Sequence, residues 1–187
     1  FARACGHRCG CAMRALAALA LSCLARVATG AAGSEKPYSF SLSTFSPDGR
    51  LQQIEFAFKA VDRALPCAAM VLDGGVVVAK CCRAGDEGLG VSESPHVCRV
   101  TESVVATYAG LPADFRALVA KCQELAIAHA RTWGEPMSVK ALAAALGAHV
   151  QEHTQLGGLR PYGAAVLVAG VDAVDGAAAL YRVDPSG

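Results

Sequence analysis

The chain has 187 residues, a length that suits one domain with a short extension. Because 53% of the residues are apolar and only 18% are charged, the chain can bury a core, and disorder over most of its length is excluded. Seventeen basic and sixteen acidic residues leave a formal net charge of +1, which lacks the basic surplus of a general nucleic-acid-binding protein.

Residues 1–36 differ in character from the rest of the chain. Arginines precede an apolar run over residues 12–25 and small residues follow it, as in secretory signals and organelle-targeting peptides. The run is shorter than the roughly 20 apolar residues that a membrane span needs. We therefore predict a signal-like, transit-like or artefactual extension over residues 1–36 and a folded domain over residues 38–187. The group Cys5, His7, Cys9 and Cys11 matches the spacing of no standard zinc finger.

The folded part begins with a turn and a helix. Pro47-Asp48-Gly49 is a turn sequence, because proline presets φ, aspartate hydrogen-bonds to the backbone and glycine tolerates positive φ. Apolar residues then recur at spacings of three and four, which predicts an amphipathic helix over Leu51–Arg63, ahead of Pro66.

Four short strands are predicted next. Ala68–Leu72 and Val76–Ala79 are apolar runs on either side of Asp73-Gly74-Gly75, which predicts a hairpin. Val97–Val100 and Val104–Tyr108 have the same strand-like composition.

Two long helices and two final strands complete the pattern. One helical face carries an apolar stripe from Leu111 through Phe115 to Ala126, and Gly134 ends that helix. Ser138 is a good N-cap for the next helix, whose stripe ends at Val150 before Gly157-Gly158. The runs Ala164–Ala169 and Ala178–Val183 predict the last strands. Strands, then helices, then strands indicate an α+β fold rather than alternating βαβ units.

Several stretches of this sequence resemble one known family. YSFSLSTFSPDGRL over residues 38–51, followed by QIEFA over 53–57, closely resembles the amino-terminal signature of proteasome α-type subunits. QEHTQ over 151–155 and GGLRPYG over 157–163 look most like the alpha type-2 members, and DPSG over 184–187 also fits the family.

The resemblance implies both a fold and a role. The fold would be a four-layer αββα sandwich of the N-terminal-nucleophile hydrolase type, incomplete at the C-terminus in this sequence. The role would be that of a non-catalytic structural and gating subunit in the outer α ring of the proteasome core particle, which degrades proteins in the cytoplasm and nucleus in an ATP- and ubiquitin-dependent way. Partners would be neighbouring α subunits, the β ring and the tails of regulatory-particle activators, with no nucleic acid, membrane or cofactor. A degenerate paralogue that does not assemble is an alternative.

A catalytic role is the other alternative. Peptidases of this fold use a threonine whose own free amine acts as the base. The aligned position is near Leu65, and the supporting Asp and Lys positions fall near Cys81 and His96, so none of the three has the needed group. Cys67 could act as a nucleophile with His96 as its base, but only after cleavage before Cys67 or in a pocket left by the crossing helix. Because buried structural cysteine is far more common, we predict no catalytic residue.

The gating residues depart from the pattern that the resemblance implies. The family holds the open state of its amino-terminal tails with a Tyr–Asp–Pro–Tyr cluster, and the matching positions here are Tyr38, Ser39, Pro47 and Phe56. Phe56 has no hydroxyl group, so it cannot make the hydrogen bond of the second tyrosine. Packing of the Phe56 ring in the core is the simpler interpretation of that residue.

His96 stands where the resemblance implies a lysine of the inter-subunit pocket, which pairs with the C-terminal carboxylate of activator tails. An ammonium group is charged near neutral pH, whereas an imidazole is mostly neutral. Activator docking at His96 would therefore be weaker and pH-dependent. A misalignment by one residue, or a surface histidine without a role, is the alternative.

The remaining polar candidates have simpler interpretations. His149 and His153 lie at the spacing of helical metal ligands, but no third ligand accompanies them, so we interpret them as a solvated or interface face and predict no metal site. Trp133, near a helix end, is interpreted as a packing residue. The cysteines after residue 37 are interpreted as mostly buried or half-buried thiols: Cys67, Cys81, Cys82, Cys98 and Cys122.

Overall fold

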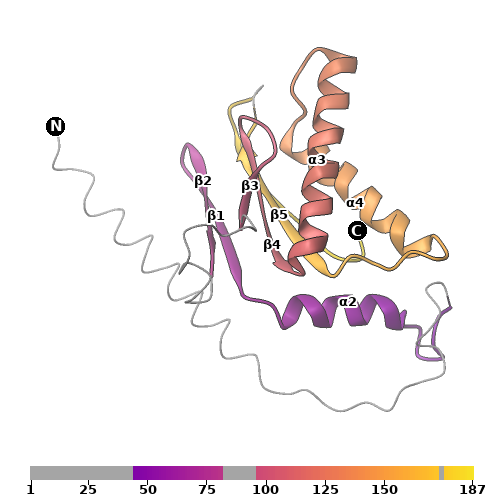
Figure 1. Cartoon of the computed structure of the whole chain (residues 1–187). Helices are drawn as coiled ribbons and strands as arrows, with labels where there is room; N and C mark the ends of the chain where they lie inside the picture. The colour runs from indigo at the N-terminus through magenta and orange to yellow at the C-terminus, as the bar shows by residue number, and fades with distance from the viewer. Residues whose placement is uncertain (1–43, 82–95, 173–174) are drawn as a thin grey trace, which may run out of the picture. The chain divides into compact units, whose positions relative to one another are not determined.

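The computed structural model describes residues 44–81, 96–172 and 175–187, which all belong to the unit Ser34–Gly187. Figure 1 shows three layers: a two-stranded sheet, a four-stranded sheet and the pair of long helices α3 and α4. The two-stranded sheet packs on one face of the four-stranded sheet, and the two helices pack on the other face. The predicted extension over residues 1–36 lies outside the described residues, as do Tyr38 and Ser39.

Helix α2 spans Gln52–Asp62, one residue inside each end of the predicted helix. Leu51 precedes it in an extended conformation, and Arg63 caps its C-terminus. Only Ala57 of this helix is fully buried. Helix α2 contacts two strands of the four-stranded sheet, β4 and β5, so this helix lies against the sheet.

Strands β1 (Cys67–Leu72) and β2 (Gly75–Lys80) form the predicted hairpin. Leu72 pairs with Gly75, which leaves Asp73 and Gly74 in the turn, and Gly74 adopts a φ of 86° that glycine tolerates at little cost. Side chains alternate between the two faces of the hairpin. On the inner face, the Lys80 Nζ lies 2.8 Å from the ring centroid of Tyr108 in the larger sheet.

The four-stranded sheet is antiparallel, with its strands in chain order: β3 (Val97–Arg99), β4 (Val104–Gly110), β5 (Ala164–Val171) and β6 (Ala178–Val183). Its centre is the long pairing of β4 with β5, in which Val104 faces Gly170 and Gly110 faces Ala164. Strand β3 is shorter than predicted, because the Val100 N–H turns back to donate to the Val104 carbonyl at 2.9 Å.

Helices α3 (Pro112–Trp133) and α4 (Val139–Gln155) cover the sheet. Both predicted boundaries are confirmed: Gly134 ends α3 with a left-handed φ of 73°, and the Ser138 Oγ accepts a hydrogen bond from the Ala141 N–H at 3.2 Å. The two apolar stripes meet the sheet in one core, whose fully buried side chains include Phe115, Leu118, Cys122, Leu142, Leu146, Val150, Val166 and Val168. Leu111 differs from the prediction, because it precedes α3 and is 45% exposed.

The prediction of an α+β fold is confirmed by these separate helical and antiparallel layers. The described residues form three of the four predicted layers. None of the helices in the described ranges combines the length and the hydropathy that a bilayer crossing requires.

Candidate functional site

The candidate site is the surface formed by the turn before α2, the exposed side of α2 and the end of the sheet that holds this helix. The turn is ordered by its own backbone: the Ser46 N–H donates to the Arg50 carbonyl at 2.9 Å, and the Gly49 N–H donates to the Ser46 carbonyl at 2.8 Å. The Ser46 Oγ accepts from the Arg50 N–H at 3.2 Å. Ser46 is buried, whereas Pro47 is exposed. The turn therefore presents Pro47 to solvent on a fixed backbone.

Phe56 lies on the solvent side of α2, 45% exposed. Lys59 lies one helical turn on, and its Nζ is 5.3 Å from the ring centroid of Phe56, within cation–π range. The interpretation of Phe56 as a core residue is therefore wrong. The error arose because the helical stripe does not show which of two adjacent apolar positions faces the sheet, and here the buried position is Ala57.

Helix α2 approaches Gly163 at the place where β4 ends and β5 is about to begin, and we call Gly110, Leu111 and Gly163 the α2 seat. The Leu111 N–H donates to the Gly163 carbonyl at 3.0 Å. A Cβ atom on Gly163 would lie 3.0 Å from the Leu111 Cδ1 and 3.6 Å from the Cβ of Ala60 in α2. A Cβ atom on Gly110 would meet the Gly163 carbonyl oxygen, and the φ of Gly110 is 129°. The close approach of these segments therefore depends on two residues without side chains.

An ion pair between Asp114, in the first turn of α3, and Arg160 holds the segment that contains Gly163 in place. Arg160 donates to both carboxylate oxygens of Asp114, with Nη1 at 2.7 Å from Oδ2 and Nη2 at 2.5 Å from Oδ1. The Gly163 N–H also donates to Asp114 Oδ2, at 2.8 Å. These hydrogen bonds, led by that from Arg160, hold the pKa of Asp114 below its usual value although burial opposes them. Asp114 was not singled out by the sequence, because no spacing rule relates it to a residue 46 positions later.

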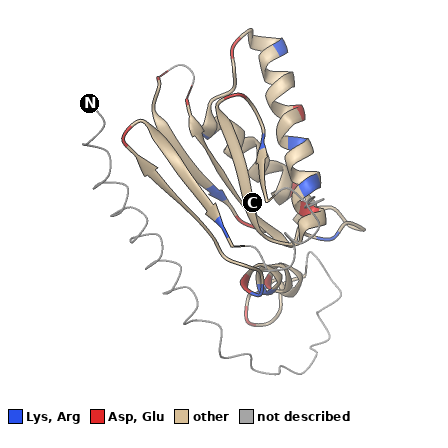
Figure 2. Cartoon of the chain, turned by 60° about the vertical axis from the view of Figure 1, so that its left-hand side comes forward, with Lys and Arg blue, Asp and Glu red and all other residues tan. Residues whose placement is uncertain are grey.

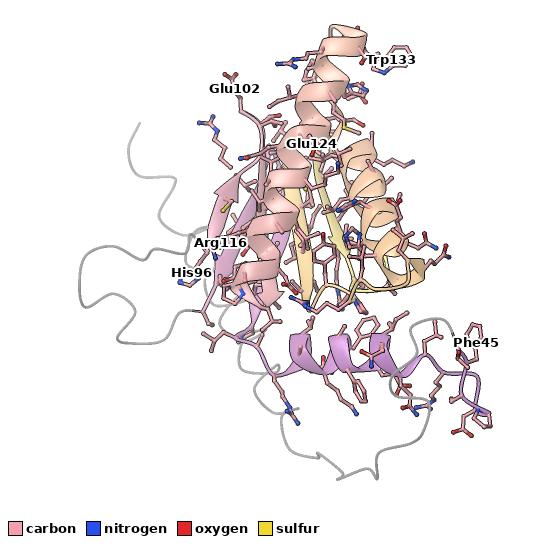
Figure 3. The ribbon with its side chains drawn as sticks, turned by 45° about the vertical axis from the view of Figure 1, so that its right-hand side comes forward. Phe45, His96, Glu102, Arg116, Glu124 and Trp133 are labelled. Atoms are coloured by element: carbon pink, nitrogen blue, oxygen red, sulfur yellow. The ribbon has the colours of Figure 1, made fainter. Side chains whose placement is uncertain are left out.

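His96 lies outside the candidate site. It directly precedes β3, and its carbonyl oxygen accepts from the Thr107 Oγ1 at 2.9 Å. Its Nδ1 is buried and has no hydrogen-bond partner among the described residues. Figure 3 shows His96 and Phe45 on opposite sides of the view, so the predicted gating residue Pro47, two residues after Phe45, and the predicted pocket residue do not come together.

The residues at the predicted nucleophile position lie within the continuous chain. Cys67 is half-buried at the start of β1 and follows Pro66, whose carbonyl accepts from the Cys81 N–H at 3.1 Å. Leu65 has an aliphatic side chain without a nucleophile, and Cys67 is an internal residue of the sequence. A Cys67 nucleophile of this type would require cleavage of the bond before Cys67.

The other described thiols differ in burial: Cys122 is buried, Cys98 is half-buried and Cys81 is exposed. Burial raises the pKa of Cys98 and raises that of Cys122 to about 12, so both thiols stay protonated at neutral pH, where only a thiolate would be nucleophilic. Cys81 is exposed, unlike the buried or half-buried state predicted for most of these residues.

His149 and His153 are half-buried rather than solvated, and both ring Nε2 atoms face the hydroxyl group of Tyr162. Trp133 is 72% exposed, so its interpretation as a packing residue is wrong for this chain. Within the described ranges, no group of three or more His, Cys, Asp and Glu side chains is placed to hold a metal ion.

Charged residues are dispersed over the surface. Figure 2 shows Lys and Arg interleaved with Asp and Glu along α3, and one such pair, Lys121 and Glu124, forms a salt bridge of 3.1 Å. This mixture gives the helix little net charge.

Comparisons with known proteins agree with the signature in the sequence. The family described as "Proteasome subunit" matches residues 61–187, and the N-terminal signature of A-type proteasome subunits matches residues 38–60. Similar proteins include the proteasome alpha type-2 subunit of Caenorhabditis elegans, 39% identical over 80% of this chain and 64% of that protein. The alpha type-2 subunit of Saccharomyces cerevisiae is 40% identical over 80% of this chain and 60% of its own length. The proteasome alpha subunit of Archaeoglobus fulgidus is 37% identical, with the same two shares.

The chain spans about three-fifths of the length of the curated relatives that it matches. The second family match begins with Tyr38 and ends within α2, so it covers the turn and most of the helix that form the candidate site. Together the two matches account for residues 38–187, and the predicted resemblance is confirmed: this chain belongs to the proteasome subunit family, among its α-type members.

Proposed function

We propose that this chain serves as a non-catalytic structural and gating subunit of the outer α ring of the proteasome core particle. The observation that carries the proposal is the α-type signature over residues 38–60, which forms the turn and most of α2 ahead of β1, together with an aliphatic residue, Leu65, at the aligned nucleophile position. An N-terminal threonine peptidase needs a threonine there, with its own free amine as the base. The polypeptide would then form part of the wall of a degradation chamber and leave peptide cleavage to other subunits.

The exposed outer face of the hairpin supports a fourth layer in the assembled fold. Leu72 and Val77 point away from the four-stranded sheet and are each 38% exposed. Apolar side chains grouped on one sheet face favour burial by a further layer. We infer that helices covering this face complete the four-layer αββα sandwich.

Gating would depend on the turn and on α2. Tyr38, Pro47 and Phe56 are the proposed gating residues, and the exposed positions of the last two support contact with a neighbouring α subunit. His96 is the proposed activator-pocket residue, where tails of a regulatory particle would dock. The other proposed partner is the β ring, and the proposed location is the cytoplasm and nucleus.

The first experiment asks whether the chain is part of a large particle. Extract from cells that express the chain is fractionated by density-gradient sedimentation, and an antibody against residues 140–155 locates the chain. Co-sedimentation with proteasome peptidase activity is expected, and its loss after immunodepletion of β subunits would identify the particle. A folded chain found only near the top of the gradient would contradict the proposal and favour the paralogue that does not assemble.

The second experiment asks whether the chain cleaves peptides by itself. Purified chain is tested on fluorogenic peptides beside its Cys67→Ala variant and, as a matched thiol control, its Cys81→Ala variant. No activity is expected from any of the three. Activity that disappears only in Cys67→Ala would replace the proposal with the thiol peptidase.

A further inference from the structure

Three ring systems meet where α4 ends and β5 is about to begin. His149 and His153 are one turn apart on α4, and Tyr162 lies in the segment that leads into β5. The Tyr162 hydroxyl oxygen lies 3.2 Å from the Nε2 of His153 and 3.4 Å from the Nε2 of His149. The two imidazole rings are 4.6 Å apart between centroids and meet edge to face. The Tyr162 hydroxyl oxygen therefore lies within hydrogen-bond distance of the Nε2 atoms of both histidines.

We propose that His149, His153 and Tyr162 bind a divalent transition-metal ion of the Zn²⁺ class, with water completing the coordination. Zn–N and Zn–O bonds of about 2.0–2.1 Å place neighbouring ligands of a tetrahedron roughly 3.3 Å apart. The two measured Nε2–oxygen separations, 3.2 and 3.4 Å, are close to that edge length. Two of the three donor–donor separations of a zinc site are therefore present in this cluster.

One histidine is already oriented for this role. The Nδ1 of His153 lies 3.0 Å from the His149 carbonyl oxygen, and because a carbonyl only accepts, Nδ1 carries the proton and donates. The Nε2 of His153 then presents a lone pair toward Tyr162. Metal-binding histidines in proteins commonly donate their second nitrogen to a backbone carbonyl or carboxylate, which fixes the ring and its tautomer.

The charged side chains near the cluster are of both signs. The Lys121 Nζ lies 3.1 Å from the Glu124 Oε1, and Glu152 lies on α4 three residues after His149.

The site would link the end of α4 to the segment that carries Arg160 and Gly163. The sequence contained the histidine pair but gave no sign of the third ligand, because Tyr162 is nine positions beyond His153 and is placed there by the chain reversal after α4. The donor set of two imidazoles and one phenol oxygen favours Zn²⁺, Cu²⁺ or Ni²⁺ over Mg²⁺, which prefers oxygen ligands.

Equilibrium dialysis of the full chain against Zn²⁺, with metal counted by atomic absorption, tests the proposal. The cysteines of residues 1–36 are able to bind zinc as well, so the result is the difference between variants. The double variant His149→Gln/His153→Gln should bind one ion fewer per chain than the unmodified protein. The matched control His129→Gln, at a half-buried histidine near the end of α3, should bind the same number as the unmodified protein.

Two further measurements separate metal binding from a loss of folding. Tyr162→Phe preserves the ring and removes only the third donor, so the affinity for Zn²⁺ should fall about tenfold or more, in the range of losses seen when groups supporting a metal site are removed. Histidine ¹⁵N NMR of the unmodified protein should show Zn²⁺-dependent shifts of Nε2 at both His149 and His153, with Mg²⁺ producing none. Equal zinc content in the unmodified and double-variant proteins, or Zn²⁺-dependent shifts at neither histidine, would overturn the proposal.

Discussion

Arg160 and Asp114 form a bidentate ion pair, in which the guanidinium group donates to both carboxylate oxygens. Asp114 also accepts a hydrogen bond from the Gly163 N–H. Asp114 is buried, whereas the side chain of Arg160 is 64% exposed. The pair joins the first turn of α3 to the segment before β5 at the place where α2 rests, so its loss should weaken the α2 seat.

Asp114→Asn should lower the free energy of unfolding at pH 7 by about 1–2 kcal/mol, because it removes charge-assisted hydrogen bonds of which one partner is exposed to solvent. The pKa of Asp114 is depressed in the folded state, so the stabilisation is present above the unfolded-state value of about 3.9 and is lost as the pH falls through the folded-state value. Urea unfolding of both proteins from pH 7 to pH 3 checks this. A difference that stayed constant over that range would contradict the role of the carboxylate charge.

Gly110→Ala should destabilise the protein by about 3 kcal/mol or more, since the new Cβ would overlap the Gly163 carbonyl oxygen and the φ of 129° strains any side chain. Gly157→Ala is the matched control, because a Cβ there meets nothing within 4 Å and its φ is not positive. That control should change stability by less than about 0.5 kcal/mol in thermal or urea unfolding. Equal losses of stability in the two variants would show that the α2 seat can accommodate a side chain at Gly110.

Phe56→Tyr should leave stability within about 0.5 kcal/mol of the unmodified protein, because the ring is 45% exposed and can hydrate the added hydroxyl. In assembled particles the same change should raise the rate of peptide hydrolysis, since it restores the hydroxyl group expected to favour the open state. Phe45→Tyr, at a 64% exposed ring before the turn, is the control and should not change the rate. Identical rates for Phe56→Tyr and unmodified particles would exclude Phe56 from gating.

His96→Lys should strengthen the binding of activator C-terminal tails severalfold at pH 7.5, because an ammonium group carries a full positive charge to pair with the tail carboxylate. Fluorescence anisotropy of a labelled tail peptide on assembled particles measures the effect. His129→Lys adds the same charge on α3 and should have no effect. No gain in His96→Lys would remove His96 from the pocket.

The sequence predicted the local elements well where a physical stop signal was present. Gly134 and Ser138 set the end of α3 and the start of α4, and the Asp73-Gly74 turn placed the hairpin. These signals act over a few residues, so one sequence suffices to read them. The pairing of β4 with β5 across two intervening helices has no comparable local signal, although it forms the centre of the sheet.

The side-chain environments were predicted less well than the elements. Phe56 and Trp133 were both interpreted as packing residues, yet they are 45% and 72% exposed. The apolar character of a helical residue indicates that its burial would be favourable, but it does not show whether another part of the chain covers it. The contact of Tyr162 with His149 and His153 likewise depends on how the chain reverses after α4, which a spacing rule cannot give.

The hairpin and the four-stranded sheet are separate hydrogen-bonded ladders in the described part of the chain. Side-chain contacts, among them that of Lys80 with the Tyr108 ring, hold one ladder against the other there, and such contacts can be broken without opening any strand pair. Hydrogen exchange should therefore divide the strands into two cooperative groups, with the amides of β1 and β2 exchanging together before those of β4 and β5. The first local opening of the described fold would therefore occur at the boundary between the two sheets.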